Sequence, residues 1–385
     1  METYDFLIAG GGGAGLGLAN ALVDSCLKSP SILIIDKEAK IQNDRTWCFW
    51  GPASAPYAGL ARHSWSKLSI RSENYEKIID LGTWRYWMIR GIDYYDSIRQ
   101  RLSQAQSVHF RIGNVERIED ADDIALVTVG NETVAARWVF DSVLRPQDIS
   151  SDTDHYHFLK QHFKGWEIEA PGDIFDPQCA TLFDFRTPQN REMRFFYVLP
   201  FSPRRALVEY TLFSADLLSE AEYETGLKDY ITDVLGLSTY TIIAEEKGVI
   251  PMTDQPFPRR TSPHVLNIGT KGGRVKPSTG YAFSRIQQDA LAIVSSLERH
   301  GHPFALPATP ARYRLYDSIL LQIMYRHGKL MKPIFLRLFE RNPIRRIFRF
   351  LDESASPFED LALISSLPPI PFLRALLKLV VLSRV

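Results

Sequence analysis

The sequence predicts a mixed α/β protein with a parallel nucleotide-binding sheet, an inserted and mainly antiparallel sheet, and a helical C-terminal region. Three observations support this prediction. A glycine-rich turn follows the first apolar run, strand-like runs of alternating polarity fill the middle of the chain, and apolar residues recur at helical intervals near its end. We assign residues 1–150 and 256–300 to the nucleotide-binding domain, 151–255 to the inserted sheet and 301–385 to the helical region.

The composition is typical of a folded globular protein without a strongly charged partner. The 385 residues suffice for two or three compact units, and 45% of them are hydrophobic while 23% are charged. Because 45 basic residues balance 45 acidic ones, we expect no nucleic-acid partner. The three cysteines, Cys26, Cys48 and Cys179, suit reduced thiols in a cytosolic setting. We expect neither a signal peptide nor a transmembrane helix.

The N-terminal residues indicate a strand, a glycine-rich turn, a helix and a second strand. The apolar run Tyr4–Ala9 leads into "GGGGAGLGLANAL", which contains the G-x-G-x-x-G spacing, and "SILIIDK" ends the second strand at Asp36. The glycines let a pyrophosphate approach the backbone at a helix N-terminus, and the acid can accept hydrogen bonds from ribose hydroxyls. A glycine-rich turn without a ligand is the less favoured alternative, because the whole context is present. The predicted cofactor residues here are Ile8, Ala9, Gly10, Gly12, Gly13, Ala14, Gly15, Asp36 and Lys37.

A second cofactor segment is predicted in "PHVLNIGTKGGRVKPSTGYAFSRIQQDALAIV", residues 263–294. An apolar strand precedes a glycine-rich loop and a helix that we expect to start near Ser278 or Thr279. The segment resembles the second flavin-contacting segment of the FAD-dependent aromatic-hydroxylase and lycopene-cyclase superfamily. The resemblance implies FAD rather than NAD, although many members have Gly-Asp where this chain has Gly269-Thr270. The implied contacts come from Gly269, Gly272, Gly273, Ser278, Thr279 and Gly280.

Between these two segments the chain reads as several short strands. Turns are predicted at Gly113-Asn114 and Gly130-Asn131. The run "WVFDS" is expected to return to the nucleotide-binding sheet and to end near Asp141. The cofactor domain is therefore predicted to be discontinuous.

Seven short motifs in order carry a resemblance to one enzyme family. They are "NDRTWCFW" (43–50), "FKGWEIE" (163–169), "LFDFR" (182–186), "FFYVLPFS" (195–202), "LVEYT" (207–211), "IPM" (250–252) and "KPSTGYAFSRIQ" (276–287). Together they resemble the lycopene β-cyclase family of carotenoid biosynthesis, and we expect a bacterial member. The resemblance implies closure of the ψ-ends of lycopene into β-ionone rings, through γ-carotene to β-carotene, without net redox change. It also implies reduced FAD, with NADPH as the source of electrons.

The stretch "RRALVEYTLFS", residues 204–214, places one carboxylate on a largely apolar strand face. Glu209 would share that face with Leu207, Thr211 and Phe213. One interpretation is an edge position with the carboxylate in water. The family resemblance instead implies a catalytic acid, because the plant motif Phe-Leu-Glu-Glu-Thr falls on residues 207–211 with its second glutamate replaced by Tyr210. Apolar surroundings would raise the pKa above about 4.3 and keep the proton in place.

Aromatic and charged residues of the family motifs are assigned to the substrate. Rings near a carbocation can each stabilise it by about 0.5–2 kcal/mol. The charged residues of "LFDFR" could line the substrate chamber or form an exposed strand face, and Arg45 could contact the cofactor or form a solvated ion pair with Asp44. The predicted substrate residues are Trp47, Trp166, Asp184, Arg186, Phe196 and Tyr197. No metal site is predicted, since His155, His157 and His162 lack a zinc-type spacing.

The C-terminal region is basic and amphipathic. Residues 326–349 hold eight lysines or arginines against the single acid Glu340, and their apolar residues recur at helical spacing. The tail "PFLRALLKLVVLSRV", residues 371–385, repeats this pattern. We expect peripheral attachment to the cytoplasmic side of a bacterial membrane; a helical cap over the substrate cavity is the alternative. The sequence leaves the oligomeric state open. Two other functions remain open as well, a redox flavoenzyme such as a monooxygenase or a polyprenyl or carotenoid reductase, and a carotenoid-binding scaffold without catalysis.

Overall fold

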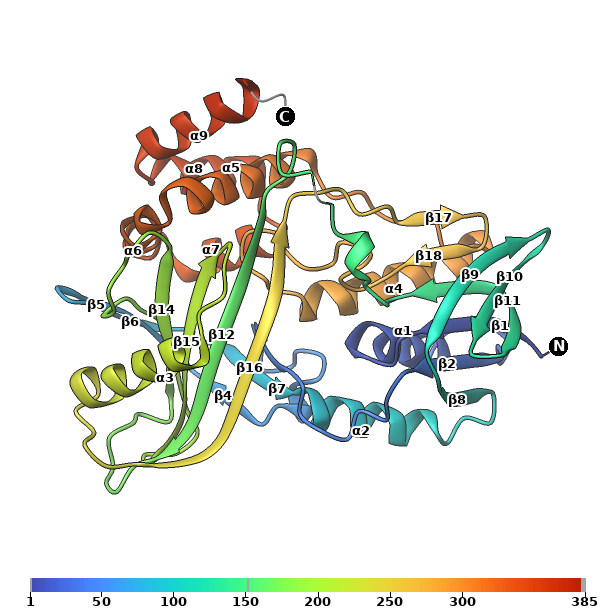
Figure 1. Cartoon of the computed structure of the whole chain (residues 1–385), viewed down its shortest axis with the longest axis horizontal. Coiled ribbons are helices and arrows are strands. Elements are labelled where there is room, and N and C mark those ends of the chain that lie inside the picture. The colour runs from blue at the N-terminus through green and yellow to red at the C-terminus, as the bar shows by residue number, and fades with distance from the viewer. Residues whose placement is uncertain (1, 151, 382–385) are drawn as a thin grey trace.

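The computed structural model describes residues 2–150 and 152–381. In Figure 1 the parallel-sheet domain lies at the right, a long antiparallel sheet lies at the left, and the C-terminal helices lie above that sheet. The polypeptide passes between the two sheets more than once, so that neither sheet is built from one continuous segment.

The parallel sheet carries the predicted strand–turn–helix–strand unit. Its central strands are β1 (Thr3–Ala9), β2 (Ile32–Asp36), β8 (Val108–Ile112), β11 (Glu132–Asp141) and β18 (Val265–Asn267), which run parallel in the order β18-β11-β1-β2-β8. The short strand β17 (Arg260–Ser262) pairs antiparallel with β18. The return of "WVFDS" to this sheet as part of β11 is confirmed.

Helices and a small antiparallel extension cover the two faces of this sheet. Helices α1 (Gly13–Val23), α2 (Gly91–Leu102) and α4 (Phe283–His300) pack together over one face and share a core with it. Strands β9 (Val115–Ala121) and β10 (Ile124–Val129) extend from β11 and close a second core over the other face. The turn at Gly130-Asn131 joins the β10–β11 hairpin, whereas Gly113-Asn114 joins two strands that do not pair with each other.

The second sheet receives strands from two parts of the chain. Its order is β16-β12-β15-β14-β13-β5-β6, with β12 (Phe158–Glu169), β13 (Cys179–Asp184), β14 (Met193–Pro200), β15 (Arg205–Ser214) and β16 (Thr241–Thr253) from the predicted insertion. Strands β5 (Lys67–Ser72) and β6 (Tyr75–Asp80) come from the range 1–150, and β5 pairs parallel with β13. The sheet therefore extends beyond the segment 151–255 that was assigned to it.

The remaining elements connect the sheets and cover them. Strands β3 (Thr46–Pro52), β7 (Trp84–Arg90) and β4 (His63–Trp65) form a small separate sheet, with a 3₁₀ turn at Ala58–Leu60. Helix α3 (Glu220–Asp229) and the π-helical turn Tyr230–Val234 pack on one face of the second sheet. Further 3₁₀ turns lie at Pro146–Asp148 and Gly328–Leu330.

Within the described residues, five α-helices follow the second cofactor segment and turn their apolar sides towards the other face of the second sheet. They are α5 (Ala311–His327), α6 (Met331–Arg341), α7 (Ile344–Leu351), α8 (Pro357–Ser365) and α9 (Pro369–Val381). Among the described residues no single helix has the length and apolar composition needed to cross a membrane. Helices α8 and α9 meet that test only as a pair, which is bent by 116° at the break between them.

Candidate active site

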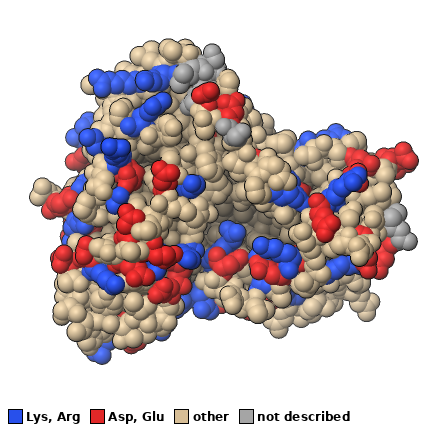
Figure 2. All heavy atoms as spheres, in the orientation of Figure 1, with Lys and Arg blue, Asp and Glu red and all other residues tan. Residues whose placement is uncertain are grey.

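A cavity of about 600 Å³ lies between the parallel sheet and the second sheet. This volume is within the range of small-molecule and cofactor sites. Figure 2 shows the molecule hollowed between its two halves, with charged side chains around the hollow. The glycine-rich turn lies at one end of the lining and the strands β15 and β16 contribute to the other end.

The glycine-rich turn, for which the sequence predicts phosphate binding, borders the cavity. Gly10, Gly12, Gly13 and Ala14 line the cavity, as do Asp36 and Lys37 at the end of β2. Helix α1 starts at this point without a side-chain cap and without an acid in its first turn, so its first N–H groups are available to an anion. The backbone N–H groups of Gly11 and Glu38 donate to the carboxylate of Asp36 at 2.7 and 3.0 Å and fix its position.

The other residues predicted in this turn contribute to packing. Ile8, Ala9 and Gly15 do not line the cavity. A Cβ atom on Gly15 would lie 1.9 Å from the carbonyl oxygen of Gly10, so only glycine allows α1 to approach the first strand this closely. In the G-x-G-x-x-G motif, Gly10 and Gly12 therefore line the cavity, and Gly15 permits the close contact between helix and strand.

The second cofactor segment borders the same cavity beside this turn, where a Cβ atom on Gly269 would lie 2.8 Å from Cβ of Ala14. Gly269, Thr279 and Gly280 line the cavity, whereas Gly272 and Gly273 do not, and Ser278 lines a neighbouring cavity. Two buried polar atoms in the lining, Oγ1 of Thr279 and Oε1 of Gln161, have no hydrogen-bond partner among the described residues. Such atoms are rare in folded proteins unless a ligand or water meets them, so the lining fits a polar cofactor.

The helix of this segment starts later than the sequence predicted. Helix α4 begins at Phe283 after Ala282, without a side-chain cap, so the expected start near Ser278 or Thr279 is wrong. The hydroxyl of Ser278 donates instead to Asp317 of α5 at 2.5 Å. Gly280 has a φ of +73°, which places a turn before the helix. Ala282 and Phe283 line the cavity, so the start of α4 lies at its wall.

Arg45 lies both at the cavity and beside Asp44, the two positions that the sequence left open for it. It lines the edge of the cavity, and its side chain is 59% exposed. Its Nε atom lies 3.9 Å from Asp44, which also accepts a hydrogen bond from Tyr95 at 2.8 Å.

Glu209 lies in the wall of the cavity and is 9% exposed. Strand β15 pairs with β12 on one side and β14 on the other, so the interpretation of an edge strand with a solvated carboxylate is excluded. Thr211 donates a hydrogen bond to Oε1 of Glu209 at 2.6 Å. Burial first, and the neighbouring Glu246 second, raise the pKa of Glu209 well above its usual range. Both effects favour the protonated form of this carboxyl.

Sequence reasoning missed the second carboxyl, Glu246. It lies on β16 and lines the same cavity, and burial raises its pKa as well. The hydroxyl of Thr46 donates to Oε2 of Glu246 at 2.6 Å, while Oε1 is buried without a hydrogen-bond partner among the described residues. Its position four residues before "IPM" was visible in the sequence, but its proximity to Glu209 depends on a strand register that the sequence does not reveal.

Neutral hydroxyl, thiol and ring groups surround the two carboxyls. Cys48, Tyr86, Tyr197 and Tyr281 all line the cavity. Burial raises the pKa of the Cys48 thiol and of the Tyr281 phenol, so both stay protonated at neutral pH. The hydroxyls of Tyr86 and Tyr281 lie 3.3 Å apart.

A second cavity of about 260 Å³ adjoins the first and is almost wholly apolar. Tyr197, Thr279 and Tyr281 line both cavities. The second cavity lies between the sheet and the C-terminal helices, where Phe183 and Phe213 face helices α5 to α9. Its aliphatic and aromatic lining from those helices, and from the turn between α8 and α9, includes Ile319, Leu320, Ile334, Phe335, Leu338, Phe339, Ile347, Phe348, Leu351, Leu363, Ile364, Leu367, Phe372, Leu373 and Leu376.

The chain matches one known protein family over almost its whole length. The family model described as lycopene cyclase protein matches residues 5–377. The chain belongs to the lycopene cyclase family. Lycopene β-cyclases from Paracoccus sp. and Pantoea ananas are 24% and 23% identical to it over 398 residues; the alignments cover 96% and 97% of this chain and 95% and 97% of the relatives. Membership identifies the chain as a carotenoid cyclase, an intramolecular lyase.

Solved structures show which fold this lycopene cyclase family member shares. A geranylgeranyl bacteriochlorophyll reductase-like protein from Thermoplasma acidophilum has a TM-score of 0.61 at 15% identity, over 99% of this chain and 100% of that chain. A flavin-dependent brominase has a TM-score of 0.60 at 14% identity, over 98% of each chain. The predicted fold class, an α/β flavoprotein fold with an inserted sheet, is thereby confirmed.

The cyclase does not bring all predicted substrate residues to its cavities. Trp47 lines the larger cavity and packs against Gly13, and Tyr197 lines both cavities. Trp166, Asp184, Arg186 and Phe196 line neither cavity, contrary to the expectation. Side chains alternate along a strand, so Trp166 and Phe196 point away from the cavity side of Gly165 and Tyr197 and pack in the core beneath α3.

Asp184 and Arg186 have a structural role in the described fold. Asp184 is fully buried and accepts hydrogen bonds from Tyr230 at 2.7 Å and from the guanidinium of Arg186 at 2.6 Å. Phe196 stacks on the ring of Tyr230 with 3.8 Å between ring centres. These contacts hold the π-helical turn against the sheet.

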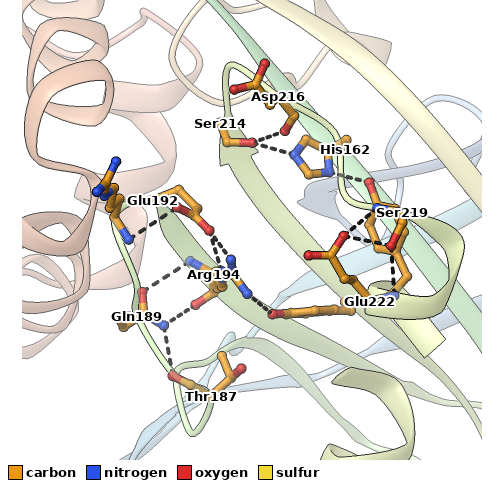
Figure 3. Close-up of polar contacts among 12 residues, drawn as sticks. His162, Thr187, Gln189, Glu192, Arg194, Ser214, Asp216, Ser219 and Glu222 are labelled. Atoms are coloured by element: carbon orange, nitrogen blue, oxygen red, sulfur yellow. Dashed lines mark hydrogen bonds and ion pairs between the residues drawn. The ribbon is translucent and has the colours of Figure 1, made fainter. Parts of the chain in front are cut away.

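The face of the sheet opposite the cavity holds its own polar network, which Figure 3 shows around Arg194 and His162. Arg194 donates to the hydroxyl of Tyr210 at 3.1 Å. The residue that replaces the second glutamate of the plant motif therefore faces away from Glu209. His162 lies between Ser214 and Tyr223, and no group of His, Cys, Asp and Glu within residues 2–150 and 152–381 is arranged to hold a metal ion.

Proposed function

We propose that this protein is a lycopene β-cyclase, which converts the ψ-ends of lycopene into β-ionone rings through γ-carotene to β-carotene, with Glu209 as the general acid. The observation that carries the proposal is a carboxyl group kept protonated by burial in a cavity that adjoins an apolar chamber. The two curated relatives from Paracoccus sp. and Pantoea ananas are lycopene β-cyclases, which supports the same substrate here.

The chemistry requires a neutral acid and no net oxidation. Glu209 donates its proton to the terminal double bond of the substrate, which leaves a tertiary carbocation. The neighbouring double bond captures that cation and closes the ring, and loss of a proton then sets the ring double bond. An ordinary glutamic acid would be ionised at neutral pH, whereas the raised pKa of Glu209 keeps its proton available.

The larger cavity fits FAD as the cofactor. The uncapped start of α1 and the backbone of Gly10, Gly12 and Gly13 would hold the pyrophosphate, and Asp36 would accept from the ribose. The partnerless atoms of Thr279 and Gln161 would meet further polar groups of the cofactor. In its reduced form FAD supplies negative charge that stabilises a developing carbocation. NADPH is proposed as the source of the electrons.

The apolar second cavity is proposed to hold the hydrocarbon next to the acid. Tyr197 and Tyr281 belong to both linings and would lie beside the reacting end of the substrate. Their rings, with that of Trp47 in the larger cavity, can stabilise positive charge by cation–π interaction. A hydrocarbon offers no polar groups, so shape and apolar contact are the main means of binding it.

We further propose peripheral attachment to the cytoplasmic side of the membrane through α8 and α9. Phe358, Leu377 and Val380 are more than half exposed there, and Arg374 and Lys378 lie on α9 beside them. Leu373 is 58% exposed and also lines the apolar cavity. This arrangement would let a lipid-dissolved substrate reach the cavity from the bilayer.

Co-expression in a lycopene-accumulating bacterial host tests the function. The wild-type protein is expected to change the pigment spectrum at constant molecular mass, because cyclisation is an isomerisation. The Glu209→Gln variant should leave lycopene unchanged while still binding flavin. A gain of one oxygen or of two hydrogens would contradict the proposal and would favour the redox flavoenzyme that the sequence also left open.

A further inference from the structure

We propose that Glu246 and Glu209 share one proton and act as a single acid–base unit, with Gly165 as the residue that lets them meet. The inference rests on the proposed role of Glu209 as the acid, and it adds a second carboxyl to the reaction. Three observations support it: the strand register, the space left by the glycine, and the lack of an ion-pair partner for either carboxyl among the described residues.

The register places the two carboxyls on either side of one residue. Strand β12 lies between β15 and β16, and Gly165 of β12 pairs with Glu209 on one side and with Glu246 on the other. Residues in register across adjacent strands project to the same face of a sheet. Glu209 and Glu246 therefore point to the same side, and both line the cavity.

Gly165 leaves the space in which the side chains approach each other. A Cβ atom at this position would lie 3.3 Å from Cβ of Glu209 and 3.3 Å from Cγ of Glu246. Both separations are tighter than ordinary contacts, so a larger residue would push the two side chains apart. Gly165 has no positive φ, so its backbone conformation does not require glycine.

No cation is in direct ion-pair contact with the carboxyls of Glu209 and Glu246 in the part of the chain that the structure describes. The charges of Glu167 and Arg62 act on Glu246 in opposite directions, the first raising and the second lowering its pKa, and Arg62 is held by Glu167 in two hydrogen bonds of 2.7 and 3.1 Å. The other titratable neighbours are the buried groups Cys48, Tyr86, Tyr197 and Tyr281, which are neutral at pH 7.

Glu209 is buried and Glu246 is half-buried with its Oε1 atom inaccessible to solvent. Two such carboxyls on one sheet face, without an ion-pair partner, cannot both ionise at low cost, so one proton remains on the pair. The more deeply buried Glu209 holds that proton, while Thr46 donates to Oε2 of the half-buried Glu246. Glu209 is thereby the donor and Glu246 the ionised partner. The second negative charge keeps Glu209 protonated at a pH at which a lone glutamate would have lost its proton.

The pair also accounts for the return of the proton. When Glu209 protonates the substrate, a C–H bond forms and both carboxyls become ionised. Ring closure forms a C–C bond at the expense of a double bond, and the ring cation then loses a proton from carbon as the ring double bond forms. The doubly ionised pair takes up that proton and returns to its starting state, so that protons and electrons balance without another reactant.

Infrared difference spectra and pH–rate profiles of purified, FAD-loaded variants test the proposal. In the wild type we expect one protonated carboxyl band at pH 7 that is sensitive to deuterium oxide and disappears in Glu209→Gln. In Glu246→Gln the repulsion is gone, so the alkaline limb of the kcat profile should move by at least one pH unit to lower pH. The carboxyl band should be lost at correspondingly lower pH.

Glu245→Gln is the matched control, since Glu245 is the neighbouring residue of β16, is exposed, and lies opposite Trp166 in register. It should leave the band and the pH profile as in the wild type. If Glu246→Gln also leaves both unchanged while Glu209→Gln abolishes turnover, the shared proton is wrong and the proposed function stands. If Glu209→Gln remains active, both proposals are wrong.

Discussion

The ammonium group of Lys276 lies 3.1 Å from Oδ1 of Asp317 in a site where both side chains are almost fully buried. Glu353 lies 3.0 Å from the same ammonium group and also pairs with Arg285. The second cofactor segment is thereby tied to α5 and to the chain after α7. The cofactor cavity and the helical region are thus mechanically connected next to Thr279, where the two cavities adjoin.

Replacement of Lys276 should destabilise the protein strongly. In Lys276→Met the buried Asp317 loses its cation, and an unpaired buried charge costs about 3–5 kcal/mol. Urea unfolding should show a loss of this size. As a control, Lys332→Met removes an ion pair with the exposed Glu73 and should cost about 1 kcal/mol or less. Equal losses for the two variants would contradict the connecting role.

Asp352 should make stability depend on pH. Burial raises its pKa to about 6, although Trp50 donates a hydrogen bond to it at 2.7 Å. The folded state therefore binds the Asp352 proton more tightly than the unfolded state does. The contribution of Asp352 to the free energy of unfolding is fully present below pH 4 and is lost as the pH rises through 6. A difference of about two units between the folded and unfolded pKa of Asp352 corresponds to about 3 kcal/mol of stability.

The measurement is the free energy of unfolding of Asp352→Asn and of wild type at pH 4 and pH 8. Asparagine keeps an acceptor for the Trp50 indole but cannot ionise. From pH 4 to pH 8 the wild type should therefore lose about 3 kcal/mol of unfolding free energy that the variant keeps. A difference that does not change with pH would show that Asp352 ionises normally in the folded protein.

Two glycines of the N-terminal turn should respond differently to alanine. In Gly15→Ala the new Cβ meets the Gly10 carbonyl oxygen at 1.9 Å, so we expect a poorly folded protein. In Gly12→Ala no atom lies within 4 Å of the new Cβ, so the fold should persist, while flavin retention falls because the methyl group occupies the proposed pyrophosphate site. Circular dichroism and flavin absorbance of the purified proteins separate these outcomes. Full flavin loading in Gly12→Ala would contradict the assigned position of the cofactor.

Much of the predicted cofactor site could be found from the sequence, because the motifs that indicate it lie close together in the chain. The spacing of Gly10, Gly12 and Gly15 and the acid at Asp36 all lie within one strand–helix–strand unit. The alternation around Glu209 likewise predicted its face correctly, since Leu207 and Phe213 line the cavities with it.

The misplaced and missed residues depend on contacts between distant parts of the chain. Trp166 was placed on the substrate side because nothing in its own motif tells which strand face meets the cavity; the pairing of Gly165 with Glu209 decides it. The start of α4 was predicted too early, because the Ser278 hydroxyl bonds to Asp317, which is 39 residues away, and does not cap the helix. Glu246 was missed for the same reason, since its register with Gly165 joins strands separated by about 80 residues in sequence.

Filling the apolar cavity should block the substrate without disturbing the acid. Leu338 lines this cavity on α6, and Leu338→Trp would occupy the space where the hydrocarbon is proposed to bind. We expect kcat/KM with lycopene to fall at least tenfold, while flavin binding and the carboxyl infrared band remain. A variant with unchanged kcat/KM would show that the hydrocarbon binds elsewhere.

Charges on the exposed face of α8 and α9 should weaken membrane attachment. The double variant Phe358→Glu with Leu377→Glu should sediment less with vesicles of phosphatidylcholine and anionic phosphatidylglycerol than the wild type. Leu291→Glu on α4 is the matched control, because Leu291 is similarly exposed at 64% but lies away from these helices. Equal sedimentation of all three proteins would contradict the proposed surface.

The central claim is that a protonated Glu209 passes its hydrogen to lycopene, and a single turnover in deuterium oxide tests it most directly. Protein equilibrated in deuterium oxide and loaded with reduced FAD should yield γ-carotene, the product with one closed ring, that is one mass unit heavier, because one deuterium enters as one protium leaves. Glu209→Gln should yield no cyclic product. A ring-closed product without deuterium, or equal turnover by the Glu209→Gln variant, would contradict the account.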